Sequence, residues 1–365
     1  MKIIQVISSL GNGGAEKLVV ELSNQLAIAN DVTIVSLKRV EDFMFPPKKI
    51  TSKVNIIETN KRKGLDLQVL FQLVSILREK KPEIVHIHLN MALYYFLLLI
   101  PFFRRISFCY TIHNTFDPHE NLFKKLNKLP FYRKITNVCL SRSIYSDFNK
   151  AFPKLRFTTI ENGLNEMKPT DLNESVRQEI GLKNSNPRDK VFLFVGRFSY
   201  QKNIPLLLEI FSDRRLENST LLIIGSGSFE LTDQIERICN KSKGRIIFLG
   251  SRDNVVDYMQ YVDALILTSH HEGLPIVVLE ALSLGLPVLS TPVGAMPDII
   301  QYGVNGFLSK SIDINDMIDI IVRFCKLDKV ELKVMENNNI MLYNKKFSIE
   351  SCARKYTDLF VNVNG

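Results

Sequence analysis

The sequence predicts an α/β protein of two domains, each built on a doubly wound parallel sheet. In both halves, short apolar segments typical of strands alternate with amphipathic segments typical of helices. The length of 365 residues is too great for one ordinary hydrophobic core and favours two. Apolar residues make up 45% of the chain and charged residues 23%, which is the composition of a globular protein and excludes a disordered one.

Strands are expected where an apolar run ends in a polar or glycine-bearing loop. In the first half these runs are residues 2–10, 31–38, 54–59, 83–89, 106–114, 136–141 and 157–163. In the second half they are residues 191–197, 220–227, 245–250, 264–269, 287–291 and 306–309. Helices are expected to begin near Ala15, Asp66 and Met91, and residues 345–363 have the pattern of an amphipathic helix. The polar stretch 165–190 is expected to hold the hinge between the domains.

The cysteines and the first residues indicate a cytoplasmic protein. The five cysteines are scattered singly, without the spacing of a metal site or a disulfide framework. The chain starts with one lysine and a short apolar run before a glycine cluster, which is a poor match to a signal peptide. The longest apolar run, residues 93–103, is shorter than the roughly 20 residues that cross a bilayer. We expect it to be a buried helix.

Positive charge is concentrated in the first half of the chain. Residues 1–165 hold 24 Lys and Arg against 13 Asp and Glu, whereas the remainder holds 23 against 25. Within the first half, residues 119–135 interleave apolar and basic side chains, a pattern suited to an anionic membrane surface. A solvated helix face explains the same pattern equally well. No nucleic-acid-binding motif accompanies the charge, so no nucleic-acid partner is expected.

The first glycine loop lies between the first strand and the first helix. Gly13 and Gly14 let backbone amides and the helix dipole approach an anionic or polar group. A nicotinamide fingerprint requires G-x-G-x-x-G and an acid after the second strand. Here the glycine spacing differs, and the second strand ends near Lys38 and Arg39. An NADP-dependent oxidoreductase therefore remains only as an alternative.

A second loop, GRFSYQKN, leaves the first strand of the second half. After Gly196 it supplies Arg197 and Lys202, two cations that can converge on phosphate oxygens. An ordinary surface turn explains the loop equally well. Gly225, Gly227 and Gly250 end later strands and let a ligand approach the backbone.

The stretch HHEGLPIVVLE holds two acids, Glu272 and Glu280, on either side of a mostly apolar run. Pro275 is expected to begin a helix, with Gly273 and Leu274 before it and unbonded amides at its start. Glu272 then lies in the preceding loop and Glu280 inside the helix, about 80° around and about 12 Å along on a helical projection. The two acids can then bind separate parts of one elongated ligand. A structural glutamate paired with a cation, together with a capping acid, is the alternative.

Several motifs together resemble one known family. They are GNGGAEK near the start, TIHN at 111–114, ENGL at 161–164, VGRFSYQKN at 195–203, IIGSG at 223–227, and the run from ALILTSHHEGLPIVVLEALSLGLPVLST through GVNGFL. Over nearly the whole chain the sequence resembles the retaining, nucleotide-sugar-dependent glycosyltransferases of family 4. The resemblance implies the GT-B fold, in which two Rossmann-like domains face a central cleft. It implies an acceptor domain of residues 1–165 with the helix 346–365, and a donor domain of residues 166–345.

The resemblance also implies roles for individual residues. Arg197 and Lys202 match the pair that neutralises the donor diphosphate without a metal ion. Glu272 matches the acid that positions the donor sugar, and Glu280 the one that binds the ribose. His113 matches the histidine near the reacting carbon. Gly13 and Gly14 match the loop that lets the acceptor and the diphosphate approach. Ser251 and Arg252 match the family's nucleobase pocket.

Four positions depart from the family pattern and leave the donor open. They are Glu161, Asn165, Ala295 after Gly294, and Asp298. The resemblance implies a reaction that moves a hexose or N-acetylhexosamine from a UDP- or GDP-sugar with retention and needs no cofactor. A same-face displacement is the mechanism usually proposed for the family, and the sequence does not decide this point. His86 and His88 point to the same side of a strand and are expected to be structural.

The acceptor is expected to be a saccharide linked to a polyprenyl diphosphate, because the basic acceptor domain suits the anionic inner face of the cell membrane. A nucleotide-sugar epimerase or phosphorylase of similar fold and a non-catalytic sugar-binding protein remain alternatives, together with the oxidoreductase.

Overall fold

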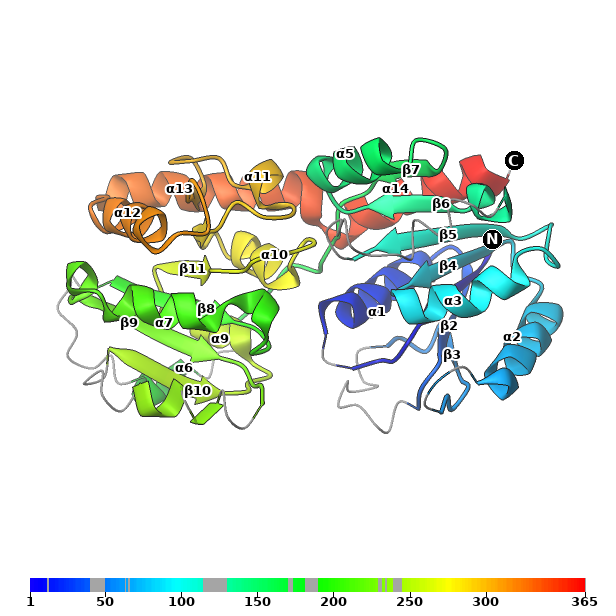
Figure 1. Ribbon diagram of the computed structural model, residues 1–365, viewed down its shortest axis with the longest axis horizontal. Helices are drawn as coiled ribbons and strands as arrows, with labels where there is room; N and C mark the ends of the chain where they lie inside the picture. Colours follow the sequence, from blue (N-terminus) through cyan, green and yellow to red (C-terminus); the bar gives the residue numbers. More distant parts are fainter. Residues whose placement is uncertain are drawn as a thin grey trace. The chain divides into compact units, whose positions relative to one another are not determined.

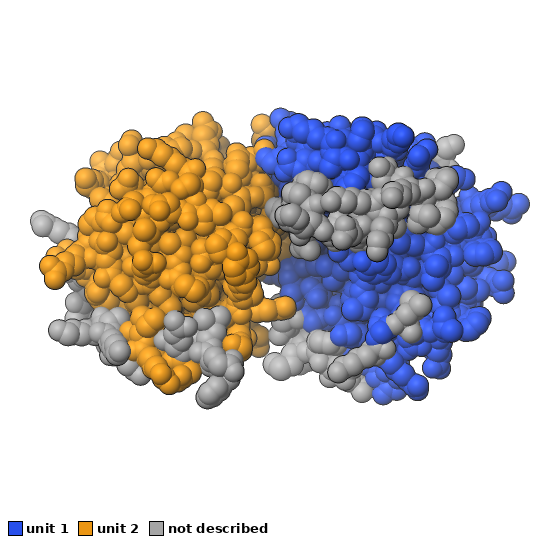
Figure 2. Space-filling model, in the orientation of Figure 1, with its two compact units in different colours: residues 1–165, 346–365 blue, residues 166–345 orange. Residues whose placement is uncertain are grey.

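The computed structural model divides the chain into two compact units. Unit 1 is Met1–Asn165 with Lys346–Gly365, and unit 2 is Glu166–Lys345; Figure 2 shows them in two colours. The structure describes residues 1–11, 13–39, 50–62, 64, 66–113, 130–169, 173–180, 190–228, 232–233, 235–238 and 245–364. Of the segment 119–135, residues 119–129 lie outside the described residues.

Unit 1 contains a seven-stranded, all-parallel sheet in the order β3-β2-β1-β4-β5-β6-β7 (Figure 1). Its strands are β1 Lys2–Ile7, β2 Asp31–Ser36, β3 Val54–Glu58, β4 Ile84–His88, β5 Ser107–Ile112, β6 Thr136–Cys139 and β7 Arg156–Thr159. The seven expected strands are confirmed, and most end one to three residues earlier than the apolar runs suggested. They end early because the last residues of each run lead into the polar loops at the carboxyl edge.

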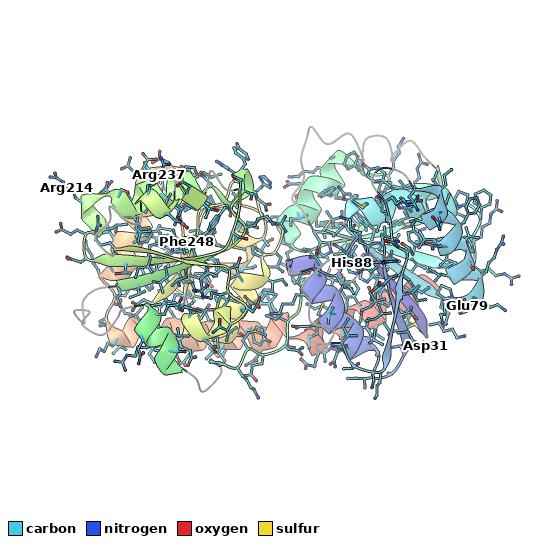
Figure 3. The ribbon with its side chains drawn as sticks, turned by 90° about the horizontal axis from the view of Figure 1, so that it is seen from below. Asp31, Glu79, His88, Arg214, Arg237 and Phe248 are labelled. Carbon is cyan, nitrogen blue, oxygen red and sulfur yellow. The ribbon has the colours of Figure 1, made fainter. Side chains whose placement is uncertain are left out.

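Helices cover both faces of this sheet. They are α1 Gly14–Leu26, α2 Leu67–Lys80, α3 Asn90–Leu99, α5 Arg142–Ala151 and α14 Ile349–Asn364, with a 3-10 helix at Pro130–Lys134. Right-handed crossovers place helices on opposite faces when the strand order changes direction. Figure 3 shows α1 and α14 on one face of the sheet and α2 and α3 on the other.

The C-terminal helix α14 is attached to unit 1 by polar contacts. The Tyr356 hydroxyl lies 2.8 Å from Thr111 Oγ1 of β5, and Ser107 Oγ donates to the carbonyl of Val363 at 2.8 Å. Lys355 Nζ lies 2.7 Å from a carboxylate oxygen of Glu161. One departure from the family pattern, Glu161, therefore serves to hold this helix.

Unit 2 contains a six-stranded parallel sheet in the order β10-β9-β8-β11-β12-β13. Its strands are β8 Lys190–Val195, β9 Ser219–Ile224, β10 Ile246–Gly250, β11 Ala264–Leu267, β12 Val288–Ser290 and β13 Gly306–Leu308. Its helices are α6 Asn173–Glu179, α7 Ile204–Ser212, α9 Val255–Met259, α10 Ile276–Ser283, α11 Met296–Ile299, α12 Ile314–Cys325 and α13 Lys329–Leu342. Short 3-10 helices lie at Tyr200–Lys202 and Arg214–Leu216, and a π-helix spans Tyr343–Phe347. Phenylalanines of β8 pack with apolar residues of α7 and α12 in its core.

Each sheet has a point at which the strand order reverses. In unit 1 it lies between β1 and β4, and in unit 2 between β8 and β11. Loops leaving the carboxyl ends of such strands diverge and leave a crevice, where ligands of this fold class bind. The loops after β1 and β4, and those after β8 and β11, are therefore the places to seek a site.

The apolar run at 93–103 is only partly buried. Within α3, Leu93 and Phe96 are buried, whereas Tyr94 and Leu98 are exposed, and Phe102 beyond the helix is 82% exposed. The expectation of a buried helix is therefore wrong for one face of α3. Among the described residues, no helix is both long and apolar enough to span a membrane.

Candidate active site

A largely buried ion pair lies at the carboxyl edge of the sheet of unit 2. Lys202 ends the 3-10 helix after β8, and Glu272 lies in the loop after β11, the neighbouring strand. Lys202 Nζ lies 2.5 Å from Glu272 Oε1, and the two side chains are 14% and 4% exposed. Two loops from the reversal point therefore meet through opposite charges.

Neighbouring side chains complete the environment of Glu272. Ser269 Oγ donates to the same carboxylate oxygen at 2.6 Å. Gln201 Nε2 donates to the other oxygen at 3.4 Å and to the carbonyl of His271 at 3.0 Å. A purely structural role, in which Glu272 is paired with a cation, predicts this ion pair as well. It lies at the reversal point of the sheet, which is where ligands of this fold class bind.

The backbone beside Glu272 depends on Gly294. This glycine has φ +58°, and a Cβ there would lie 1.7 Å from the carbonyl oxygen of Glu272. The amide of Ala295 donates to the carbonyl of Gly273 at 3.0 Å. The loop after β12 thus packs directly on the Glu272–Gly273 backbone. Only the first glycine of the usual pair is needed for this contact.

The helix predicted after Glu272 is present as α10. Pro275 is its N-cap residue, and Glu280 is a half-buried residue within it. The helical projection from Glu272 is wrong, because residues 272–275 precede the helix. The first amides of α10 lack acceptors within the helix and lie at the same sheet edge as Glu272.

The glycines after β8 and β9 serve contacts between two loops. A Cβ on Gly225 would lie 2.0 Å from the Gly196 carbonyl, and one on Gly227 would lie 2.4 Å from Phe198 Cβ. A Cβ on Gly196 would lie 3.3 Å from Lys202 Cε. These glycines let the loops pack closely and let the Lys202 side chain cross the end of β8.

Arg197 and Arg252 have different surroundings. Arg197 is exposed, and its side chain forms no hydrogen bond or ion pair with the described residues. Arg252 donates to the Tyr258 hydroxyl at 3.0 Å and to the Ser251 carbonyl at 3.1 Å, and forms an ion pair with Glu179 of α6. Arg252 thus joins α6 to α9, and its role at a nucleobase stays a prediction.

Unit 1 contains a chain of buried polar side chains that ends at the half-buried His113. This residue follows β5, and its Nε2 lies 3.1 Å from Nδ1 of His88 in β4. His88 Nε2 in turn lies 2.8 Å from Oε1 of Gln5 in β1. Because an amide oxygen only accepts hydrogen bonds, His88 Nε2 carries the proton and His88 Nδ1 accepts one from His113. Figure 3 places His88 inside this unit.

Burial keeps these imidazoles neutral. It lowers the pKa of His113 to about 4 and that of His86 to about 3, and it holds the pKa of His88 well below its usual range. His86 Nε2 lies 2.7 Å from Thr111 Oγ1, which also contacts Tyr356 of α14. His86 is therefore structural, as expected, whereas His88 holds the candidate residue His113.

The first glycine loop has the expected position. Gly13 is the N-cap residue of α1, Gly14 is its first residue, and the helix starts at the carboxyl edge of β1. A Cβ on Gly13 would lie 2.2 Å from the Glu16 carboxylate. Among the described residues, no cluster of three or more His, Cys, Asp or Glu side chains is placed to hold a metal ion.

The structure adds four residues to the candidate set. Ser269 and Gln201 contact Glu272, and His88 and Gln5 extend from His113. Gln5 could have been noticed, because an amide inside a central apolar strand needs a partner when buried. Gln201 and His88 were hidden because their partners come from other loops or strands, whereas Ser269 lies three residues before Glu272 in the same loop.

Sequence models of two glycosyltransferase families match successive parts of the chain. The Glycosyltransferase Family 4 model matches residues 12–167, and the Glycosyl transferases group 1 model matches residues 176–340. The chain is 23% identical over 311 residues to N-acetyl-alpha-D-glucosaminyl L-malate synthase of Bacillus anthracis, covering 82% of this chain and 79% of that protein. It is 26% identical over 326 residues to UDP-Gal:alpha-D-GlcNAc-diphosphoundecaprenol alpha-1,3-galactosyltransferase of Escherichia coli, covering 82% and 80%.

Solved structures share the fold over the whole chain. A glycosyltransferase from Rickettsia africae matches with a TM-score of 0.83 at 18% identity, covering 99% of this chain and 98% of that one. HepE of Anabaena, solved in complex with UDP, matches with a TM-score of 0.81 at 18% identity, covering 99% and 100%. The two Rossmann-like units have the GT-B fold of these structures. The chain belongs to the glycosyltransferases whose two halves carry the family 4 and group 1 models.

Proposed function

We propose that the chain transfers a hexose or N-acetylhexosamine from a UDP-sugar, with a GDP-sugar as the second choice, to a saccharide acceptor with retention of configuration. The observation that carries this is the Lys202–Glu272 ion pair at the reversal point of unit 2. A relative that uses UDP-Gal and a structural neighbour solved with UDP support a uridine donor. The comparisons do not favour an epimerase or an oxidoreductase.

In this proposal, unit 2 stabilises the leaving diphosphate. Breaking the bond between the anomeric carbon and phosphate places negative charge on the diphosphate and positive character on the sugar. Lys202, Arg197 and the first amides of α10 supply the compensating charge, so the reaction needs no metal ion. Bound diphosphate competes with Glu272 for Lys202. The carboxylate is then released to accept hydrogen bonds from sugar hydroxyls, and Glu280 binds the ribose.

Unit 1 provides the acceptor side. His113, held neutral and oriented by His88, offers a polar group to the sugar near the reacting carbon. We propose an acceptor linked to a polyprenyl diphosphate, because the Escherichia coli relative acts on a GlcNAc-diphosphoundecaprenol and unit 1 is basic. The enzyme then works in the cytoplasm, peripherally on the inner face of the cell membrane. A small soluble acceptor is the second candidate, favoured by the relative named N-acetyl-alpha-D-glucosaminyl L-malate synthase.

Release of UDP or GDP from a panel of nucleotide sugars tests the proposal. We expect release from one donor to depend on an added lipid-linked saccharide, to persist in EDTA, and to be lost in Lys202→Met. Proton NMR of the product should show the anomeric configuration of the donor. Interconversion of nucleotide sugars without an acceptor, or activity only with NADP, would contradict the proposal.

A further inference from the structure

The outer surface of α2 and α3 in unit 1 exposes large apolar side chains. Phe71 of α2 is 72% exposed and Phe102, just after α3, is 82% exposed. With the other exposed apolar residues of these helices they form what we call the α2–α3 face: Leu67, Phe71, Met91, Tyr94, Leu98 and Phe102. Clustered exposed apolar residues on a globular protein mark a surface that contacts a partner or a membrane.

Residue spacing and one hydrogen bond bring these side chains to one surface. Leu67 and Phe71 are four residues apart, and Met91, Tyr94 and Leu98 follow at steps of three and four, so each helix presents one apolar stripe. The amide of Asp66, at the start of α2, donates to the hydroxyl of Tyr95 in α3 at 3.0 Å. The two helices lie on the same face of the sheet, opposite α1 and α14 (Figure 3).

Cations flank the α2–α3 face at both ends. Lys61 and Arg62 precede α2, and Arg104 and Arg105, both exposed, follow Phe102. Residues 60–113 hold eight Lys and Arg against three Asp and Glu. An apolar stripe with basic side chains at its borders is the composition of surfaces that lie in the interface of an anionic bilayer.

Unit 2 also exposes apolar residues on one helix. Val330, Val334 and Met341 of α13 are 72%, 53% and 61% exposed. That helix holds two lysines and two glutamates, and one pair, Lys333–Glu336, is joined by an ion pair. Lysines also lie at both ends of α13, but residues 323–346 hold six Lys and Arg against three Asp and Glu, a smaller excess of cations than around the α2–α3 face.

We propose that the α2–α3 face is a docking surface for an anionic lipid bilayer. Its apolar side chains enter the boundary between headgroups and acyl chains, while the flanking cations bind the headgroups. The use of this docking, to bring unit 1 to a lipid-linked acceptor, rests on the proposed function. The docking itself needs neither donor nor acceptor.

Co-sedimentation of the full chain with vesicles tests the docking. We expect binding to phosphatidylcholine vesicles containing phosphatidylglycerol, and much weaker binding without it. The variant Phe71→Ser, Leu98→Ser, Phe102→Ser should lose about tenfold or more in partition coefficient, given the cost of withdrawing apolar side chains from an apolar phase. The matched variant Val330→Ser, Val334→Ser, Met341→Ser should bind as the unchanged protein does. Circular dichroism melting confirms that each variant is folded.

Three results would overturn the docking. One is an equal loss, or no loss, in both triple variants. Another is a loss of binding only when Lys124, Lys125, Lys128, Arg133 and Lys134 are changed to Gln, which would assign the membrane contact to residues 119–135. The third is a concentration-dependent dimer that the α2–α3 variant abolishes, which would make this face an interface between copies. Donor-dependent UDP release with a soluble acceptor analogue reports on the proposed function separately.

Discussion

The Lys202–Glu272 ion pair offers the sharpest test, because it links stability to donor binding. Replacing Lys202 by Met keeps the length of the side chain but leaves the Glu272 carboxylate, which is 4% exposed, without its cation. Removing one partner of a buried pair costs about 3–5 kcal/mol of unfolding free energy. For a protein of this size each kcal/mol lowers Tm by about 2–4 °C.

The opposite variant should be milder. Glu272→Gln leaves an unpaired ammonium, but Lys202 is 14% exposed and can reach water more easily. We expect a loss of roughly 1–3 kcal/mol. In the double variant neither charge is left unpaired, so the two losses should fall short of additive by about 2 kcal/mol. Urea unfolding followed by circular dichroism measures all three values.

A second ion pair in unit 2 provides the control. Lys190 Nζ lies 2.9 Å from Asp263 Oδ1, and these side chains are 15% and 29% exposed. Lys190→Met should also reduce stability but should leave UDP binding, measured by calorimetry, unchanged. Lys202→Met should abolish UDP binding, and Glu272→Gln should bind UDP at least as tightly as the unchanged protein. Additive losses in the cycle, or UDP binding that survives Lys202→Met, would refute the reasoning.

Three further predictions concern the surroundings of the two candidate sites. Gly294→Ala should lower the free energy of unfolding by about 2 kcal/mol or more, because it adds a clash to a left-handed backbone. The control Gly303→Ala, at a position with φ +75° and open space around it, should lower it by about 1–2 kcal/mol. Equal losses in urea unfolding would argue against the contact of Gly294 with Glu272. His88→Ala should reduce kcat for UDP release about 10-fold to 100-fold, by releasing His113, and change KM for the donor little; a change in KM alone would contradict a positioning role. The pKa of His113 falls from 6.5 to about 4 on folding, so the unfolded chain binds more protons between these pH values. The free energy of unfolding should therefore fall as pH falls through that window, by about 3 kcal/mol from this residue. Urea unfolding of His113→Asn across the same range should show a flatter profile, and an unchanged profile would contradict the shift.

The fold class was predictable because its signals are local. Alternating apolar strands and amphipathic helices place all thirteen strands found among the described residues, and Pro275 marks the start of α10. The projection from Glu272 failed because it extended helical geometry into a loop. Periodicity also could not show that α3 is exposed on one side, because residues 93–103 are apolar all round.

The contacts that define the candidate site were not predictable from local pattern. Lys202 and Glu272 are 70 residues apart, and His88 and Gln5 are 83 residues apart. The first pair forms because neighbouring parallel strands bring their loops to one edge, and the second because β1 and β4 lie side by side in the sheet. Glu161 departs from the family motif, and only the structure shows why: it forms an ion pair with Lys355 of α14.

A crystal structure of the protein soaked with UDP tests the central claim most directly. The diphosphate should lie within hydrogen-bonding distance of Lys202 Nζ and the first amides of α10, with Glu272 turned away from the lysine and the ribose on Glu280. A nucleotide bound elsewhere, with the Lys202–Glu272 pair still closed, would contradict it.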